Sequence, residues 1–157
     1  MNQRTIKTAQ QFLQTIEEAA KRADEAKRNT FAAADLAMTA GQQAEICYWE
    51  VNHTDTPESV KEAADRVADT ANEALAWAAE AAEAAKTATC YFLLTIKVAL
   101  EVGTEEAYKV ADKAHRAAEA AEEAAWWATT KVADARMAAT RAARYHHLAL
   151  IRAARKA

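Results

Sequence analysis

Histidine and cysteine side chains that could hold a metal are expected to meet at one end of the folded chain. His53 lies in a polar stretch between two helical patterns, Cys47 lies shortly before it, and His146 and His147 are adjacent in a later helical pattern. Imidazole and thiolate are common zinc ligands, and imidazole also ligates haem iron. No HxxxH, HExxH or CxxC spacing occurs, and neighbouring helical residues point about 100° apart. A metal site at these four residues is therefore a secondary hypothesis.

Four aromatic residues form a second candidate site. Phe31, Trp77, Trp126 and Trp127 are expected at a similar level midway along the helices. Trp126 and Trp127 occupy largely polar heptad columns, and two adjacent residues cannot both face one seam. At least one ring is therefore expected to be exposed, as part of a partner surface or of a platform for a flat hydrophobic ligand such as haem. The alternative is that the rings fill gaps between alanine layers.

Residues 88–100 are apolar nearly all round, so more than one side of this segment should be covered. The segment is too short to cross a bilayer. We expect Leu93, Leu94 and Leu100 to remain uncovered and to form a self-association surface, together with the tryptophan pair. Lys97 lies inside the segment, where a desolvated lysine could form a Schiff base. Its heptad column is polar, however, which favours a surface lysine.

Other catalytic chemistry finds no support in the sequence. Two glycines cannot build a phosphate-binding glycine loop, and Ser59 is the only serine. The carboxylates are spread over expected solvent faces and are not paired inward, as di-iron bundles require. We therefore predict a protein that is not an enzyme and has no cofactor, with haem as the alternative.

The composition indicates the elements that must position these residues. The chain has 157 residues, of which 45 are alanine and only 23 are leucine, isoleucine, valine or phenylalanine. Such a composition with a helical repeat is typical of long packed helices. The two glycines and one proline exclude a sheet with many hairpins, and the length fits a single domain, residues 1–157.

Helix boundaries are marked at two places. Thr56 can cap a helix that Pro57 begins, and Gly103 can end that helix before Thr104 caps the next one. The pattern predicts helices over about 3–52, 57–102 and 105–156, with possible breaks at Asn29-Thr30 and Gly41. Short loops make neighbouring helices antiparallel. The predicted fold is an all-α, elongated antiparallel three-helix bundle.

Apolar residues recur at alternating spacings of three and four, which predicts left-handed coiled-coil packing. Most seam positions are alanine, so the helices should approach near the lower end of the usual separation of about 8–10 Å. In the first helix we place the seam at these positions: Ala9, Leu13, Ile16, Ala20, Ala23, Lys27, Thr30, Ala34, Ala37, Gly41, Ala44, Tyr48 and Val51.

The charge pattern agrees with this topology. Residues 135–157 carry a basic block without acids, and residues 55–69 carry several acids that an antiparallel hairpin places beside it. This pairing, with a net charge of −3, argues against a nucleic-acid partner. No apolar run is long enough for a membrane span, and two cysteines do not make a disulfide framework. We expect a cytoplasmic protein with no membrane partner.

Residues 56–135 resemble de novo designed helical bundles. The likeness rests on residues 56–64 (TPESVKEAA), 78–86 (AAEAAEAAK) and 103–111 (GTEEAYKVA), whereas residues 1–52 are less regular. The resemblance implies an idealised scaffold that carries an engineered site or interface. With the exposed apolar residues, it predicts a non-catalytic scaffold that forms homo-oligomers. A binder of a small hydrophobic ligand is the alternative.

Overall fold

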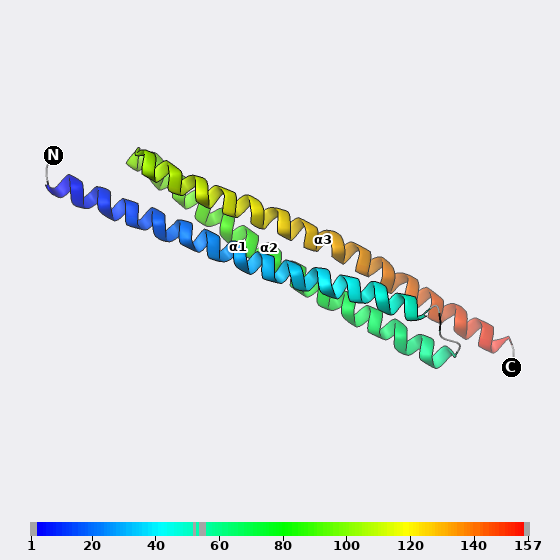
Figure 1. Ribbon diagram of the computed structural model, residues 1–157. Coiled ribbons are helices and arrows are strands. Elements are labelled where there is room, and N and C mark those ends of the chain that lie inside the picture. The colour runs from blue at the N-terminus through cyan, green and yellow to red at the C-terminus, as the bar shows by residue number, and fades with distance from the viewer. Residues whose placement is uncertain (1–2, 52, 54–55, 156–157) are drawn as a thin grey trace. The chain divides into compact units, whose positions relative to one another are not determined.

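Three helices make up the computed structural model, which describes residues 3–51, 53 and 56–155 and the side chains from residue 10 onward. They are α1 (Gln3–Val51), α2 (Pro57–Val102) and α3 (Glu105–Ala154), and the described residues include no strand (Figure 1). Each described boundary lies within two residues of its predicted position. The fold is an all-α three-helix bundle, as predicted.

Both helix junctions use the predicted capping residues. The Ser59 backbone N–H donates to the Thr56 hydroxyl oxygen at 3.3 Å, and the Ala107 N–H donates to that of Thr104 at 3.3 Å. Gly103 has φ +67°, and its N–H donates to the Ala99 carbonyl at 2.8 Å. The positive φ explains why α2 ends at glycine, since a Cβ disfavours this conformation.

We expect Gly103→Ala to lower the free energy of unfolding by about 1–2 kcal/mol, the cost of a left-handed alanine. A Cβ at this position meets no atom within 4 Å, so the cost is conformational rather than steric. Urea unfolding followed by circular dichroism measures it. Gly103→Asn should cost less, because asparagine tolerates this conformation better. Equal stability of Gly103→Ala and the parent would contradict the explanation.

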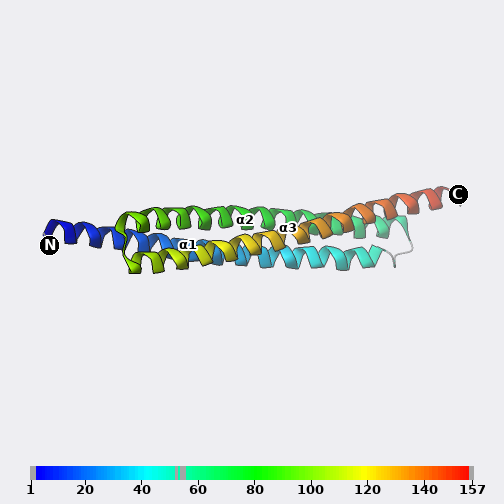
Figure 2. The same ribbon diagram turned by 90° about the horizontal axis from the view of Figure 1, so that it is seen from above.

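Contacts between residues divide the bundle into two units, and each unit contains a segment of all three helices. Unit 1 comprises residues 1–32 and 80–125, and unit 2 comprises residues 33–79 and 126–157. Within each unit, the α2 segment runs antiparallel to the α1 and α3 segments (Figure 2). Folding of the whole chain as one domain stays a prediction.

The core of unit 1 contains few large apolar side chains. One cluster joins Ile16 of α1 to Val98 and Ala99 of α2 and to Ala107 and Ala111 of α3. A second cluster consists of Ala23, Ala114 and Ala117, against which partly buried rings of α2 pack. Small side chains at so many core positions require close helix approach, as the sequence predicts.

The predicted seam of α1 is half right. One column is buried as expected: Ile16, Ala23, Thr30, Ala37, Ala44 and Val51. In the other predicted column Ala34 and Gly41 are buried as expected, whereas Ala20, Lys27 and Tyr48 are only half-buried. The neighbouring column, one residue earlier, is buried throughout: Ala19, Ala26, Ala33, Ala40 and Cys47. Because α1 packs against two helices, its apolar band is wider than a two-stranded seam, and adjacent alanines do not reveal its centre.

Helix α1 continues through both predicted weak points. The Thr30 hydroxyl donates to the Ala26 carbonyl at 2.9 Å, which satisfies this fully buried side chain. A Cβ at Gly41 would lie 3.3 Å from the Lys131 carbonyl oxygen. Gly41 therefore serves the close approach of α1 and α3 in unit 2 and does not break the helix.

Candidate functional site

Three large apolar side chains form a stripe on the outer face of α2 in unit 1. Leu93, Ile96 and Leu100 are 55%, 38% and 66% exposed. Their spacing of three and four places them within about 60° of one another around the helix. We call these three residues the α2 stripe. Leu94, predicted to belong to the same surface, is exposed but points about 100° away from Leu93.

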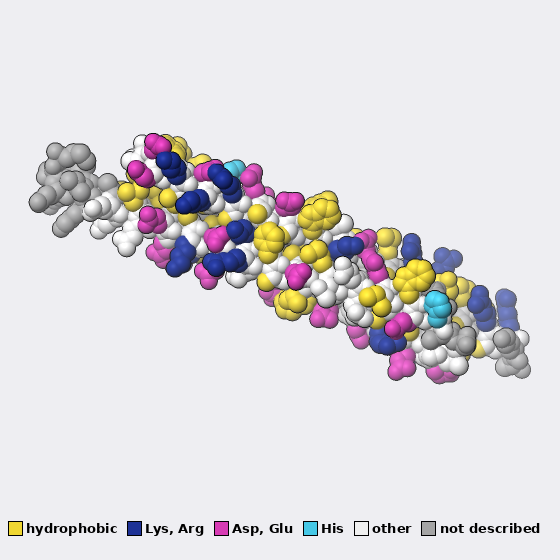
Figure 3. Space-filling view, viewed as in Figure 1, with side chains coloured by type: hydrophobic (Ala, Val, Ile, Leu, Met, Phe, Trp, Pro, Cys, Tyr) yellow, Lys and Arg dark blue, Asp and Glu magenta, His cyan; other side chains and the backbone are white. Residues whose placement is uncertain are grey.

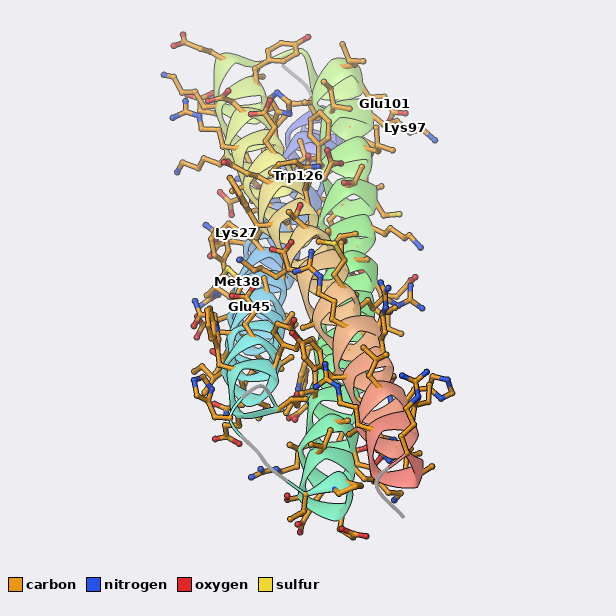
Figure 4. The ribbon with its side chains drawn as sticks, turned by 90° about the vertical axis from the view of Figure 1, so that its right-hand side faces the viewer. Lys27, Met38, Glu45, Lys97, Glu101 and Trp126 are labelled. Atoms are coloured by element: carbon orange, nitrogen blue, oxygen red, sulfur yellow. The ribbon has the colours of Figure 1, made fainter. Side chains whose placement is uncertain are left out.

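Opposite charges border the α2 stripe. Lys97 and Glu101 are exposed and extend away from α2 (Figure 4). They are spaced i, i+4, yet neither forms an ion pair with another described residue. Lys97 is thus a surface lysine, as the sequence favours, and lacks the desolvation that Schiff-base chemistry needs. Cys90, one turn before Leu93 along α2, is an exposed free thiol.

Leu94 lines a shallow groove between α1 and α2 in unit 1. Arg22 Nη1 donates to the Tyr91 hydroxyl at 3.3 Å, and Arg22 Nη2 donates to Glu18 Oε1 at 2.9 Å, beside Leu94 in the same groove. The hydrogen bond that Arg22 donates to Tyr91, followed by the one that it donates to Glu18, raises the pKa of Arg22. The sequence pattern did not reveal this contact, because it depends on the register between two helices.

The tryptophan pair is exposed, in line with the expectation that one ring at least lies outside the core. Trp126 and Trp127 are 59% and 49% exposed, and their ring centroids lie 4.7 Å apart in an edge-to-face arrangement. Figure 4 shows Trp126 on α3. Trp77 is half-buried in the same unit 2, whereas Phe31 is exposed and belongs to unit 1.

The structure does not bring the histidines and Cys47 together as a metal site. The described residues hold no group of three or more His, Cys, Asp and Glu side chains that could bind a metal. Cys47 is buried and accepts a hydrogen bond from Gln43 Nε2 at 3.6 Å, whereas His53 Nδ1 lies 2.8 Å from the Trp49 carbonyl. Cys47 is buried, His146 is half-buried, and His53 and His147 are exposed.

The chain matches no protein-family model, no curated protein and no solved structure. Among the described helices, none contains a segment with the length and apolarity needed to span a membrane.

The predicted pairing of the late basic block with the early acids of α2 does not take the form of ion pairs. Arg136, Arg141 and Arg144 are exposed and form no ion pair within the described part of the chain. The contact between helices is instead made by Arg66 of α2, whose Nη2 lies 2.9 Å from Glu50 Oε2 of α1. From residue 143 onward no described α3 side chain is buried. Arg144 therefore extends into solvent.

Proposed function

We propose that the protein is a non-catalytic helical scaffold that self-associates through the α2 stripe. The observation that carries this proposal is the exposure of Leu93, Ile96 and Leu100 on one face of a continuous helix. Full burial of such a side chain contributes about 1.5–3 kcal/mol, and covering the exposed fractions of all six in two copies contributes about 5–10 kcal/mol. A pair of copies that covers both stripes therefore gains enough to offset the entropy of association at moderate protein concentration.

An antiparallel arrangement aligns the apolar residues of the two stripes. With a two-fold axis between Ile96 and Lys97, Leu93 of one copy lies opposite Leu100 of its partner. Ile96 then lies opposite Lys97 of the partner, at the rim of the contact, where the ammonium group can extend into solvent.

Light scattering coupled to size-exclusion chromatography tests the proposal. We expect at least twice the chain mass of 17.1 kDa, in reducing buffer and over a wide range of protein concentrations. Cys90→Ser should associate equally well, which separates packing from disulfide formation at this exposed thiol. A monomeric mass at every concentration would remove the proposal.

A platform for a flat hydrophobic ligand at Trp126 and Trp127 is the second candidate function. The exposed edge-to-face pair favours it, since each ring leaves apolar surface open to solvent. Haem is the probe: a Soret band that grows on titration and is lost in Trp126→Ala would support this function. An unchanged haem spectrum would contradict haem binding at this tryptophan pair.

A further inference from the structure

A groove of about 530 Å³ lies between α1 and α3 in unit 1. Small apolar side chains, among them Ala20 and Ala117, form its floor. Four cations line it, Lys21 and Lys27 from α1 and Lys113 and Arg116 from α3. Lysine and arginine side chains gather over the first halves of these two helices (Figure 3). Two carboxylates, those of Glu17 and Asp24, also line the groove, so cations outnumber anions around its small apolar side chains.

Acidic side chains neutralise only part of this charge. Lys27 Nζ lies 2.7 Å from Asp24 Oδ1, and Arg116 forms an ion pair with Asp112. The hydrogen bond from Lys27 lowers the pKa of Asp24, so this carboxylate stays ionised. Lys21 and Lys113, one on each helix, have no ion-pair partner within the described residues. Two ammonium groups without an ion pair therefore line the groove, one from each helix, beside the Glu17 carboxylate.

We propose that this groove binds the oligophosphate group of a small molecule. Lys21 and Lys27 are separated by about 9 Å along α1, a spacing that a chain of linked phosphates can span. Lysines act as point charges for phosphate oxygens, and the guanidinium of Arg116 adds a planar fork. The apolar floor strengthens these interactions, because it excludes water from one side. This site is separate from the α2 stripe and goes beyond the scaffold function.

Isothermal titration with tripolyphosphate tests the site on the full chain. We expect Lys21→Ala/Lys113→Ala to weaken binding by at least about tenfold, because each lysine supplies a charge-assisted hydrogen bond. Lys61→Ala/Lys86→Ala is the matched control: it removes the same charge from exposed helix faces outside the groove. Alanine favours helix at all four positions, so the fold should persist. No binding to the parent, or an equal loss in both variants, would overturn the proposal.

A second substitution tests the groove without removing a ligand contact. Glu17 lines the groove, so Glu17→Gln should tighten tripolyphosphate binding by about twofold to fivefold. Glu25→Gln, an exposed α1 residue outside the groove, should leave the affinity unchanged. Equal gains in affinity from both variants would show that the net charge of the chain, and not the groove, determines tripolyphosphate binding. Citrate is the chemical control, and citrate binding as tight as that of tripolyphosphate would refute the assignment to phosphate.

Discussion

Replacing Ala121 by leucine should destabilise the bundle by about 2–3 kcal/mol. Ala121 is fully buried in α3 within unit 1, where Ala85 of α2 and Ala26 of α1 are also buried. Three additional heavy atoms have no space between helices that are separated by methyl groups. The helices must move apart, which loses dispersion contacts in neighbouring layers as well. Urea unfolding monitored by circular dichroism gives the change.

The matched control is Ala79→Leu, which adds the same atoms at an exposed position of α2. Both substitutions exchange one strong helix former for another, so intrinsic propensity cancels from the comparison. We expect the control to remain within about 0.5 kcal/mol of the parent. If Ala121→Leu were as stable as this control, close alanine packing would not be what holds the helices together.

The helix boundaries could be predicted because their signals are local. Pro57 fixes a backbone angle that suits the first turn, and Gly103 supplies the positive φ that ends α2. Neither signal depends on the other helices. The stripe was predicted only in part: Leu93 and Leu100 were expected on this surface, whereas Ile96 was not named and Leu94 points elsewhere.

The rotation of α1 could not be predicted in the same way. Ala19 and Ala20 have identical side chains, yet the first is buried and the second only half-buried. Periodicity distinguishes positions only where side chains differ. At Ala33 and Ala34 both residues are buried, so the packing of α1 against two neighbours sets the width of the buried band.

The groove between α1 and α3 was missed, although one signal in the sequence pointed to it. Lys27 falls in a predicted core column, where a charged residue needs a partner or an opening to solvent. The structure provides both, an ion pair with Asp24 and a groove at the surface. Which α3 cations share that groove depends on interhelical register, to which neither Lys113 nor Arg116 gives a local clue.

We expect Leu93→Glu/Leu100→Glu to abolish self-association and to raise the dissociation constant by at least about a thousandfold. Removal of two leucines from each stripe forfeits more than about 4 kcal/mol of burial, before charge repulsion is counted. The control Leu36→Glu/Ile46→Glu makes the same change of charge and hydropathy at exposed positions of α1. If both variants lost association equally, the α2 stripe would not be the interface.

A charge-reversed variant determines the orientation of the two copies. In the antiparallel arrangement residue 93 lies opposite residue 100 of the partner, so Leu93→Glu/Leu100→Lys creates two opposite-charge contacts. We expect this variant to recover part of the association that Leu93→Glu/Leu100→Glu loses, in a manner that salt weakens. In a parallel pair the same variant would place like charges together and recover nothing. Light scattering at low and high salt distinguishes these results, because recovery at low salt alone identifies direct pairing of the two substituted positions across the antiparallel interface.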